Sequence, residues 1–277
     1  MPTAAGPNIA EFDIEQEIGR GTAACVYRAR DKANDRTVAL KILRGECTDT
    51  VRERFRRECV SAIRVRHPNV VAVYDVGQFE GRPYMVMELI DGKPLDLKRP
   101  LRATVEALVK VAVALDTAHR EGVVHRDLKP ANILVDAAGE PHIVDFGLAH
   151  LIDGSATVTK RGFAVGTPAY MAPEQVCGWK DVIGPATDVY AMGAMLYEAL
   201  AGRPPHIGKH ATAVIQSIRT TDPPAPPGPR PIVDVCLKAI ERVAAKRYSR
   251  ASAFADALGD WLNAEAVTRM TRRRPRP

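Results

Sequence analysis

The sequence has few cysteines, and their spacing does not suggest any pairing. The five are odd in number, widely scattered, and form no Cys-x-x-Cys or Cys/His cluster of the kind that builds zinc sites. The chain also lacks the roughly 18 to 20 consecutive apolar residues of a membrane span. Its N-terminus lacks the basic-then-apolar pattern of a secretion signal. These absences predict reduced thiols, no transmembrane segment in this chain and a cytoplasmic location.

Net charge is small outside the C-terminal end. The formal charge is +6, but five arginines lie in the last nine residues. Arginines interleaved with prolines favour disorder, so residues 263–277 are predicted to be a basic, disordered and solvated tail. Contact of this tail with anionic lipid or nucleic acid is the alternative. We expect no specific nucleic-acid partner.

The periodicity of apolar residues changes along the chain. Up to about residue 90, β-branched and apolar residues between turn formers predict a small antiparallel sheet. Residues 51–66 instead follow a helical period and end at His67-Pro68, which predicts one main helix on that sheet. Beyond residue 91, apolar residues recur at three- and four-residue steps. The predicted fold class is therefore α+β, with two lobes, the second larger and mainly α-helical.

Two features of the predicted sheet could contact a polyphosphate. Residues 19–24, GRGTAA, lie between two strands, where backbone amides could close over phosphates. Taken alone, this segment could equally be an ordinary hairpin turn. Lys41 lies in an apolar strand, and a buried ammonium needs an anion such as Glu58 on the following helix. An edge lysine that reaches water is the alternative.

The most specific pattern combines residues 125–132, HRDLKPAN, with residues 145–147, DFG. Phosphoryl transfer needs a carboxylate to orient the attacking hydroxyl, oxygen ligands for a metal ion, and a cation near the transferred phosphate. Asp127, Lys129, Asn132 and Asp145 supply these groups. A single Asp or Asn in a loop is usually only a turn former, but this order and spacing indicate phosphoryl transfer.

With these motifs the chain resembles eukaryotic-type serine/threonine protein kinases, including those of bacteria, over residues 12–262. The resemblance implies an N-terminal extension (1–11), a small lobe (12–90) and a large lobe (91–262). It also implies transfer of the ATP γ-phosphoryl group to serine or threonine hydroxyls of protein substrates. The implied cofactors are ATP and Mg²⁺, with Mn²⁺ as a substitute.

The resemblance also assigns roles to individual residues. Asp127 would accept the hydroxyl proton, and Lys129 would contact the γ-phosphate. Asn132 and Asp145 would hold the metal ion, while Lys41, paired with Glu58, would bind the α- and β-phosphates. The implied nucleotide-binding set is Ile18, Gly19, Arg20, Gly21, Thr22, Val26, Ala39, Lys41, Met87, Glu88, Ile90, Asn132, Leu134 and Asp145.

Residues 166–174, GTPAYMAPE, resemble the kinase segment that seats the substrate hydroxyl. Thr167 would position the substrate and, with Lys129, is similar to the serine/threonine-specific branch. Arg247 is predicted to be a buried partner of Glu174. Asp188 resembles the acid that braces the catalytic loop, although a simple helix N-cap is the alternative.

The segment before residues 166–174, which are the expected substrate platform, suggests regulation. Arg126 resembles the arginine that binds a phosphorylated activation loop, and Thr157 and Thr159 are predicted phosphate acceptors. Autophosphorylation would be served by self-association of two copies. The sequence leaves open the protein substrates, the activating signal, the oligomeric state, and whether the chain belongs to a longer membrane-anchored kinase.

A pseudokinase, which binds nucleotide without phosphotransfer, is the principal alternative function. Loss of Lys41, Asp127 or Asp145 would indicate it, and all three are present. Ala24 replaces the third glycine of the phosphate-covering turn, which should at most weaken nucleotide binding. A kinase of small molecules is a further alternative, which the intact segment 166–174 disfavours.

Overall fold

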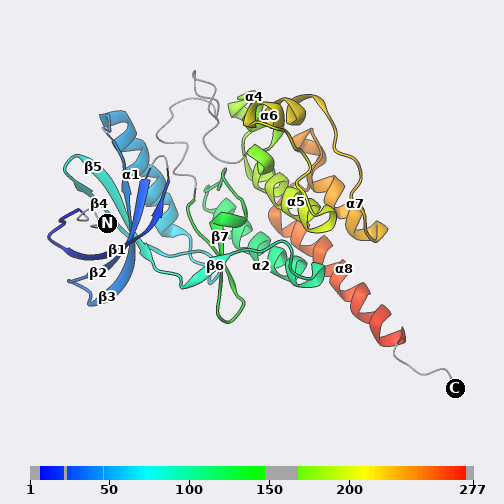
Figure 1. Ribbon diagram of the computed structural model, residues 1–277, viewed down its shortest axis with the longest axis horizontal. Helices are drawn as coiled ribbons and strands as arrows, with labels where there is room; N and C mark the ends of the chain where they lie inside the picture. The colour runs from blue at the N-terminus through cyan, green and yellow to red at the C-terminus, as the bar shows by residue number, and fades with distance from the viewer. Residues whose placement is uncertain (1–6, 22–23, 46, 147–167, 273–277) are drawn as a thin grey trace.

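A computed structural model of the chain describes residues 7–21, 24–45, 47–146 and 168–272. These residues form two lobes, one built on a sheet and one mainly helical (Figure 1). The predicted two-lobed α+β fold is therefore confirmed. The elements of the small lobe are β1 (Phe12–Arg20), β2 (Ala24–Asp31), β3 (Arg36–Leu43), α1 (Asp49–Arg64), β4 (Val73–Phe79) and β5 (Arg82–Glu88).

The five strands of the small lobe pair antiparallel in the order β1-β2-β3-β5-β4. Successive side chains of a strand point to opposite faces of the sheet. Leu40 and Ile42 therefore pack on one face with the N-terminal residues Ile9 and Phe12. Lys41, between them, points to the other face, which α1 covers. The strand alternation thus directs a lysine toward the space between the lobes.

Helix α1 begins after Thr48, whose side chain accepts a hydrogen bond from the Val51 backbone N–H at 3.3 Å. Phe55 and Cys59 are buried against the sheet. The predicted helix over residues 51–66 is thus present, displaced by two residues. All five cysteines are free, and burial raises the pKa of Cys59 to about 12, so this thiol stays protonated.

The large lobe is built around α5, whose residues 187–197 are all buried. Gly193 of this helix lies so close to the neighbouring helix that an added Cβ would stand 2.6 Å from the Cβ of Ala239. Only glycine permits this approach. The remaining elements are β6 (Gly92–Pro94), α2 (Leu101–Arg120), β7 (Ile133–Asp136), β8 (Pro141–Ile143), α4 (Pro173–Cys177), α5 (Pro185–Ala201), α6 (Ala211–Thr220), α7 (Arg230–Ala239) and α8 (Ala251–Arg272).

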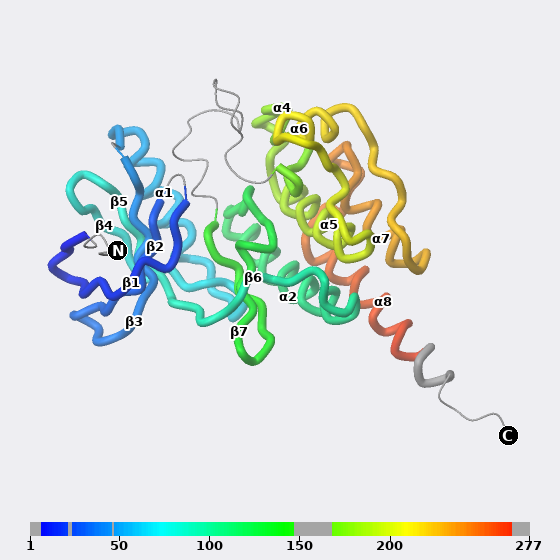
Figure 2. Tube along the Cα trace, in the orientation of Figure 1, coloured from blue at the N-terminus to red at the C-terminus, as the bar shows by residue number. Residues whose placement is uncertain are grey.

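Helix α8 continues past the predicted start of a disordered tail. It runs to Arg272 (Figure 1). It leaves the body of the large lobe at the lobe's far end, as Figure 2 also shows. Arg102 of α2 anchors it, donating to the Leu262 carbonyl at 3.3 Å and pairing with Glu265 at 3.1 Å. The prediction of disorder is therefore wrong for residues 263–272, because tertiary contacts and alanines extend the helix. Residues 273–277 lie outside the described residues.

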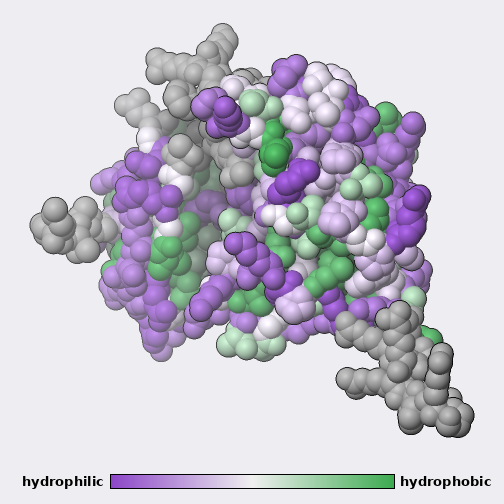
Figure 3. Space-filling view, turned by 45° about the vertical axis from the view of Figure 1, so that its right-hand side comes forward, coloured by the Kyte–Doolittle hydropathy of each residue, from purple (hydrophilic) through white to green (hydrophobic). Residues whose placement is uncertain are grey.

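The surface of the large lobe mixes hydrophilic residues with small apolar groups (Figure 3). Trp179 and Ile207 are each more than half exposed, and isolated apolar residues at a protein surface are common. Among the described residues, no helix is long and apolar enough to cross a membrane.

His206 should make stability depend on pH. Burial, and then the charge of Arg242, lower its pKa from 6.5 to about 4. Between these values the unfolded chain binds a proton that the folded chain does not, so stability falls as pH falls from 6.5 to 4. The melting temperature of the wild type should fall more steeply across this window than that of His206→Gln. A constant difference between the two proteins would contradict this expectation.

Candidate active site

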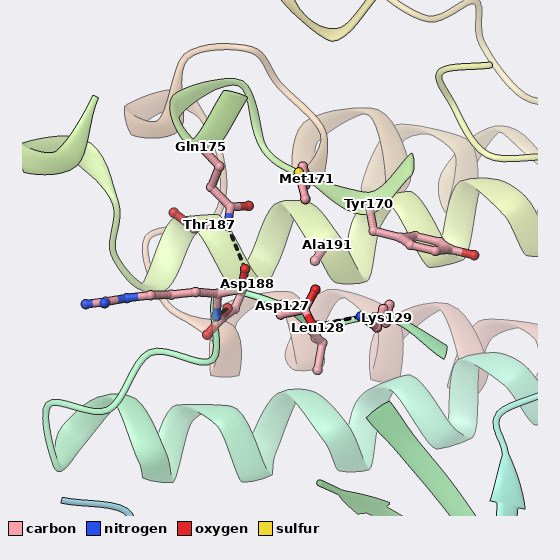
Figure 4. Close-up of a pocket in the computed structure, with 10 residues that line it drawn as sticks. Asp127, Leu128, Lys129, Tyr170, Met171, Gln175, Thr187, Asp188 and Ala191 are labelled. Carbon is pink, nitrogen blue, oxygen red and sulfur yellow. Dashed lines mark hydrogen bonds and ion pairs between the residues drawn. The ribbon is translucent and has the colours of Figure 1, made fainter. Parts of the chain in front are cut away.

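The segment between α2 and β7 brings together the predicted catalytic side chains of Asp127 and Lys129 (Figure 4). Asn132, a predicted metal ligand, lies beside them. Lys129 donates from Nζ to Oδ2 of Asp127 at 2.7 Å. Asn132 donates from Nδ2 to the Asp127 carbonyl at 2.7 Å and to its Oδ2 at 3.2 Å. The Asp127 carboxylate is thus oriented by the Lys129 ammonium, two residues further along the chain, and by the Asn132 amide, five residues further along. A carboxylate held in this way can orient a hydroxyl group.

Asp188 of α5 braces the backbone just before Asp127. Its Oδ2 accepts from the His125 N–H at 2.8 Å, and its Oδ1 accepts from the Arg126 N–H at 2.9 Å. Burial alone would raise the pKa of Asp188, but its hydrogen bond to His119 and the charge of that histidine lower it, and the net shift is downward. The predicted bracing role is confirmed. The N-cap alternative is wrong, because Gly184 caps α5.

Asp145 follows β8 and reaches the same site. The His125 Nε2 lies 3.0 Å from the Val144 carbonyl, and the rings of His125 and Phe146 are 5.0 Å apart. These contacts hold the segment of Asp145 against the catalytic loop. Burial tends to raise the pKa of Asp145, but the charge of Lys41 lowers it, and the net direction is downward. The carboxylate is therefore ionised at neutral pH.

The partner of Lys41 differs from the prediction. Its Nζ lies 2.8 Å from Oδ1 of Asp145, and among the described residues it forms no ion pair with Glu58. Burial raises the pKa of Glu58, and the charges of Arg126 and Arg54 oppose this rise. The predicted Lys41–Glu58 pair is thus wrong for this conformation, because the packing of α1 brings Glu58 into the field of Arg126 and Asp145 compensates the lysine.

The oxygen atoms available here suit a divalent cation. Asn132 uses its Nδ2 for Asp127, and its Oδ1 accepts no hydrogen bond from the described residues. The described part of the chain contains no group of three or more His, Cys, Asp or Glu side chains that could hold a metal by itself. Mg²⁺ typically binds one or two protein carboxylates and completes its shell with water and substrate phosphates. Asn132 and Asp145 fit that pattern.

Apolar side chains line the space expected to hold the base of a nucleotide. Ala39 and Met87 are buried in one cluster, against which Val26 and Ile90 pack. Such apolar walls suit a flat heterocycle. Leu134, on β7, is half-buried.

The strand and turn that would cover the phosphates are partly described. Ile18 is 46% exposed at the end of β1. Glu88, the last residue of β5, donates its N–H to the carbonyl of Ala72, just before β4, at 2.9 Å. The turn after Gly19 and Arg20 is closed by a 2.9 Å bond from the Gly21 N–H to the Ala24 carbonyl.

The expected nucleotide contact Thr22 lies outside the described residues. So do the expected phosphorylation sites Thr157 and Thr159 and the substrate-positioning Thr167.

A buried ion pair anchors the end of the expected substrate platform. Arg247 donates from Nη1 and Nη2 to the two carboxylate oxygens of Glu174, each at 2.8 Å. Both side chains are at most 1% exposed. This predicted pair is confirmed. Sequence reasoning missed Thr187, which donates to Glu174 at 2.8 Å, and Gln175, since single polar residues near helix starts resemble ordinary caps.

Comparison with known proteins agrees with this geometry. Residues 12–262 match the family described as protein kinase domain. The chain therefore belongs to the protein kinase family, whose members use ATP and a divalent metal ion.

Several bacterial serine/threonine kinases are similar to the chain. Serine/threonine-protein kinase PknA of Mycobacterium tuberculosis is 38% identical, covering 96% of this chain and 63% of PknA. The DNA damage-responsive serine/threonine-protein kinase RqkA of Deinococcus radiodurans is 37% identical, covering 90% of this chain and 39% of RqkA. The crystal structure of the M. tuberculosis PknI kinase domain has a TM-score of 0.71 at 27% identity, covering 94% of this chain and 99% of that domain. The chain thus spans less than two thirds of the length of PknA and RqkA.

Proposed function

We propose that this chain is an active serine/threonine protein kinase domain that transfers the γ-phosphoryl group of ATP, with Mg²⁺, to protein hydroxyls. The observation that carries the proposal is the convergence of Asp127, Lys129 and Asn132, with Asp145 and Lys41 held 2.8 Å apart beside them. Retention of every charged group that phosphoryl transfer requires argues against a pseudokinase.

Each side chain has a defined task in this reaction. Asp127 orients the substrate hydroxyl and accepts its proton, while Lys129 places a positive charge near the transferred phosphoryl group. Asn132 and Asp145 would hold the metal ion, which would supply positive charge to the phosphate oxygens. Positioning and electrostatic stabilisation supply nearly all of the catalysis in phosphoryl transfer.

The Lys41–Asp145 pair must exchange partners in this scheme. Asp145 would then be available to hold the metal ion, and Lys41 would contact the α- and β-phosphates. Ile18, Gly19, Arg20, Gly21 and Thr22 would cover the nucleotide from above, and Val26, Ala39, Met87, Glu88, Ile90 and Leu134 would enclose its base.

We further propose how the domain is regulated and where it works. Thr157 and Thr159 receive phosphate from a second copy of the chain, and Thr167 helps to seat the substrate hydroxyl. Added phosphate would order its segment through cationic partners. The five free cysteines support a reducing compartment with ATP, the cytoplasm.

The test is incubation of the purified protein with radiolabelled ATP, Mg²⁺ and a generic basic protein, followed by identification of the labelled amino acids. Label on serine and threonine is expected, and peptide mapping should locate it at Thr157 or Thr159 in the kinase itself. Asp145→Asn, prepared identically, controls for contaminating kinases. Measurable ATP binding without any label would contradict the proposal and favour a nucleotide-binding scaffold.

A further inference from the structure

Gln175, in the first turn of α4, bridges the catalytic loop and the expected substrate platform. It is 4% exposed. Its Oε1 accepts from the Ala172 N–H at 3.0 Å, and its Nε2 donates to the Arg126 carbonyl at 2.6 Å. Figure 4 shows its side chain pointing from α4 toward the catalytic loop. Both ends of one buried amide are therefore used, and they join segments 49 residues apart.

The carbonyl that Gln175 holds belongs to the peptide unit that carries the N–H of Asp127. That N–H donates to the His125 carbonyl at 2.9 Å. The preceding N–H, of Arg126, donates to Asp188 at 2.9 Å. Gln175 is thus the side chain that orients the oxygen end of the peptide linking Arg126 to the catalytic aspartate.

This peptide needs external contacts, because Arg126 has a φ of 65°. Residues other than glycine adopt this left-handed region at a cost, and the surrounding structure must stabilise it. Asp188 stabilises the N–H side of Arg126 and Gln175 its carbonyl side. Rotation of the peptide would swing the Asp127 side chain away from Lys129 and Asn132.

We propose that Gln175 is a positioning residue for phosphoryl transfer. It sets the orientation of Asp127 and couples this aspartate to residues 168–177, which include the described part of the expected substrate platform. The inference rests on the proposed kinase function. Within the described part of the chain, the side-chain hydrogen bonds of Gln175 go to Ala172 and Arg126, which are neither expected nucleotide-binding residues nor expected metal ligands. Its loss should therefore affect the chemical step and leave nucleotide binding intact.

Two substitutions separate this role from simple packing. Gln175→Met keeps the length of the side chain but has neither donor nor acceptor. We expect kcat to fall about 10- to 100-fold, the cost of a misplaced catalytic group, while the KM for ATP stays within about threefold. Gln216→Met, at an exposed position of α6, is the matched control and should retain wild-type kcat.

Gln175→Glu adds a readout that packing alone would not move. Its carboxylate can still accept from Ala172 but repels the Arg126 carbonyl, whereas its protonated form donates to that carbonyl. Burial favours protonation of a carboxyl group. The kcat of Gln175→Glu relative to wild type should therefore rise as pH falls from about 8 to about 6, whereas that of Gln175→Met should stay constant. Gln175 helps to line a small pocket whose ionisable groups are Arg126, Asp127, Lys129, Tyr170 and Asp188. These groups are common to all three proteins.

Wild-type kcat in Gln175→Met, or parallel pH profiles for the two variants, would overturn the proposal. If the wild type itself transfers no phosphate, the kinase function fails, and hydrogen exchange then decides the structural part. Faster exchange in the peptides covering residues 123–132 of Gln175→Met, with unchanged exchange in α2, would support the positioning role. Unchanged exchange in both segments would exclude it.

Discussion

Asp127→Asn should lower kcat for protein phosphorylation by about 10²- to 10⁴-fold, the usual contribution of a positioned general base. Asparagine has nearly the same shape, but it cannot accept the proton of the substrate hydroxyl. Its amide also presents no charge to Lys129, which lies 2.7 Å from the Asp127 carboxylate. The KM for ATP should change by no more than about threefold, since Asp127 itself is not one of the expected nucleotide-binding residues. Steady-state kinetics with varied ATP and substrate measures both quantities.

The control for this experiment is Asp256→Asn, an identical change at an exposed position of α8. It should keep wild-type kcat. Thermal melts of both variants should match the wild type closely, which separates loss of chemistry from loss of folding. An Asp127→Asn protein with more than about a tenth of wild-type kcat would contradict the assigned role.

Arg247→Met should lower the free energy of unfolding by about 3 to 5 kcal/mol, the cost of leaving one charge of a buried pair without its partner. Both carboxylate oxygens of Glu174 lose a 2.8 Å bond. The carbonyls of Ala186 and Glu241, which also accept from Arg247 at 2.9 and 2.7 Å, lose their donors. Urea unfolding measures the change as a lower midpoint.

A double variant tests whether the stranded carboxylate causes this loss. Arg247→Met combined with Glu174→Gln removes the uncompensated charge. The loss in free energy of unfolding for the double variant should therefore be smaller than the sum of the two single losses by about 0.5 to 3 kcal/mol. Arg230→Met is the control, because its pair with Asp234 is exposed. It should cost less than about 1 kcal/mol. A cost for Arg247→Met as small as that of Arg230→Met would contradict the prediction.

Much of the site could be predicted because its residues are close in sequence. Asp127, Lys129 and Asn132 lie within six residues, and one loop places them together. The strand alternation that places Lys41 opposite Leu40 and Ile42 is also a local property of the chain.

Contacts between distant segments were less predictable. The partner of Lys41 lies 104 residues away, and a lysine between two available carboxylates pairs with whichever one the packing brings closer. The extension of α8 likewise depends on Arg102 of α2, 163 residues before Glu265. Neither contact leaves a periodic signal in the sequence.

By itself, the sequence determined the two-lobed class, the strand-borne lysine and the catalytic loop, because apolar periodicity and short-range spacing encode them directly. Only the tertiary structure decided that Asp145 rather than Glu58 pairs with Lys41, that Gln175 holds the peptide before Asp127, and that α8 continues to Arg272. The physical reason is that a buried charge or amide forms its ion pair or hydrogen bond with the nearest complementary group. Only the packing of distant helices and strands determines which group is nearest.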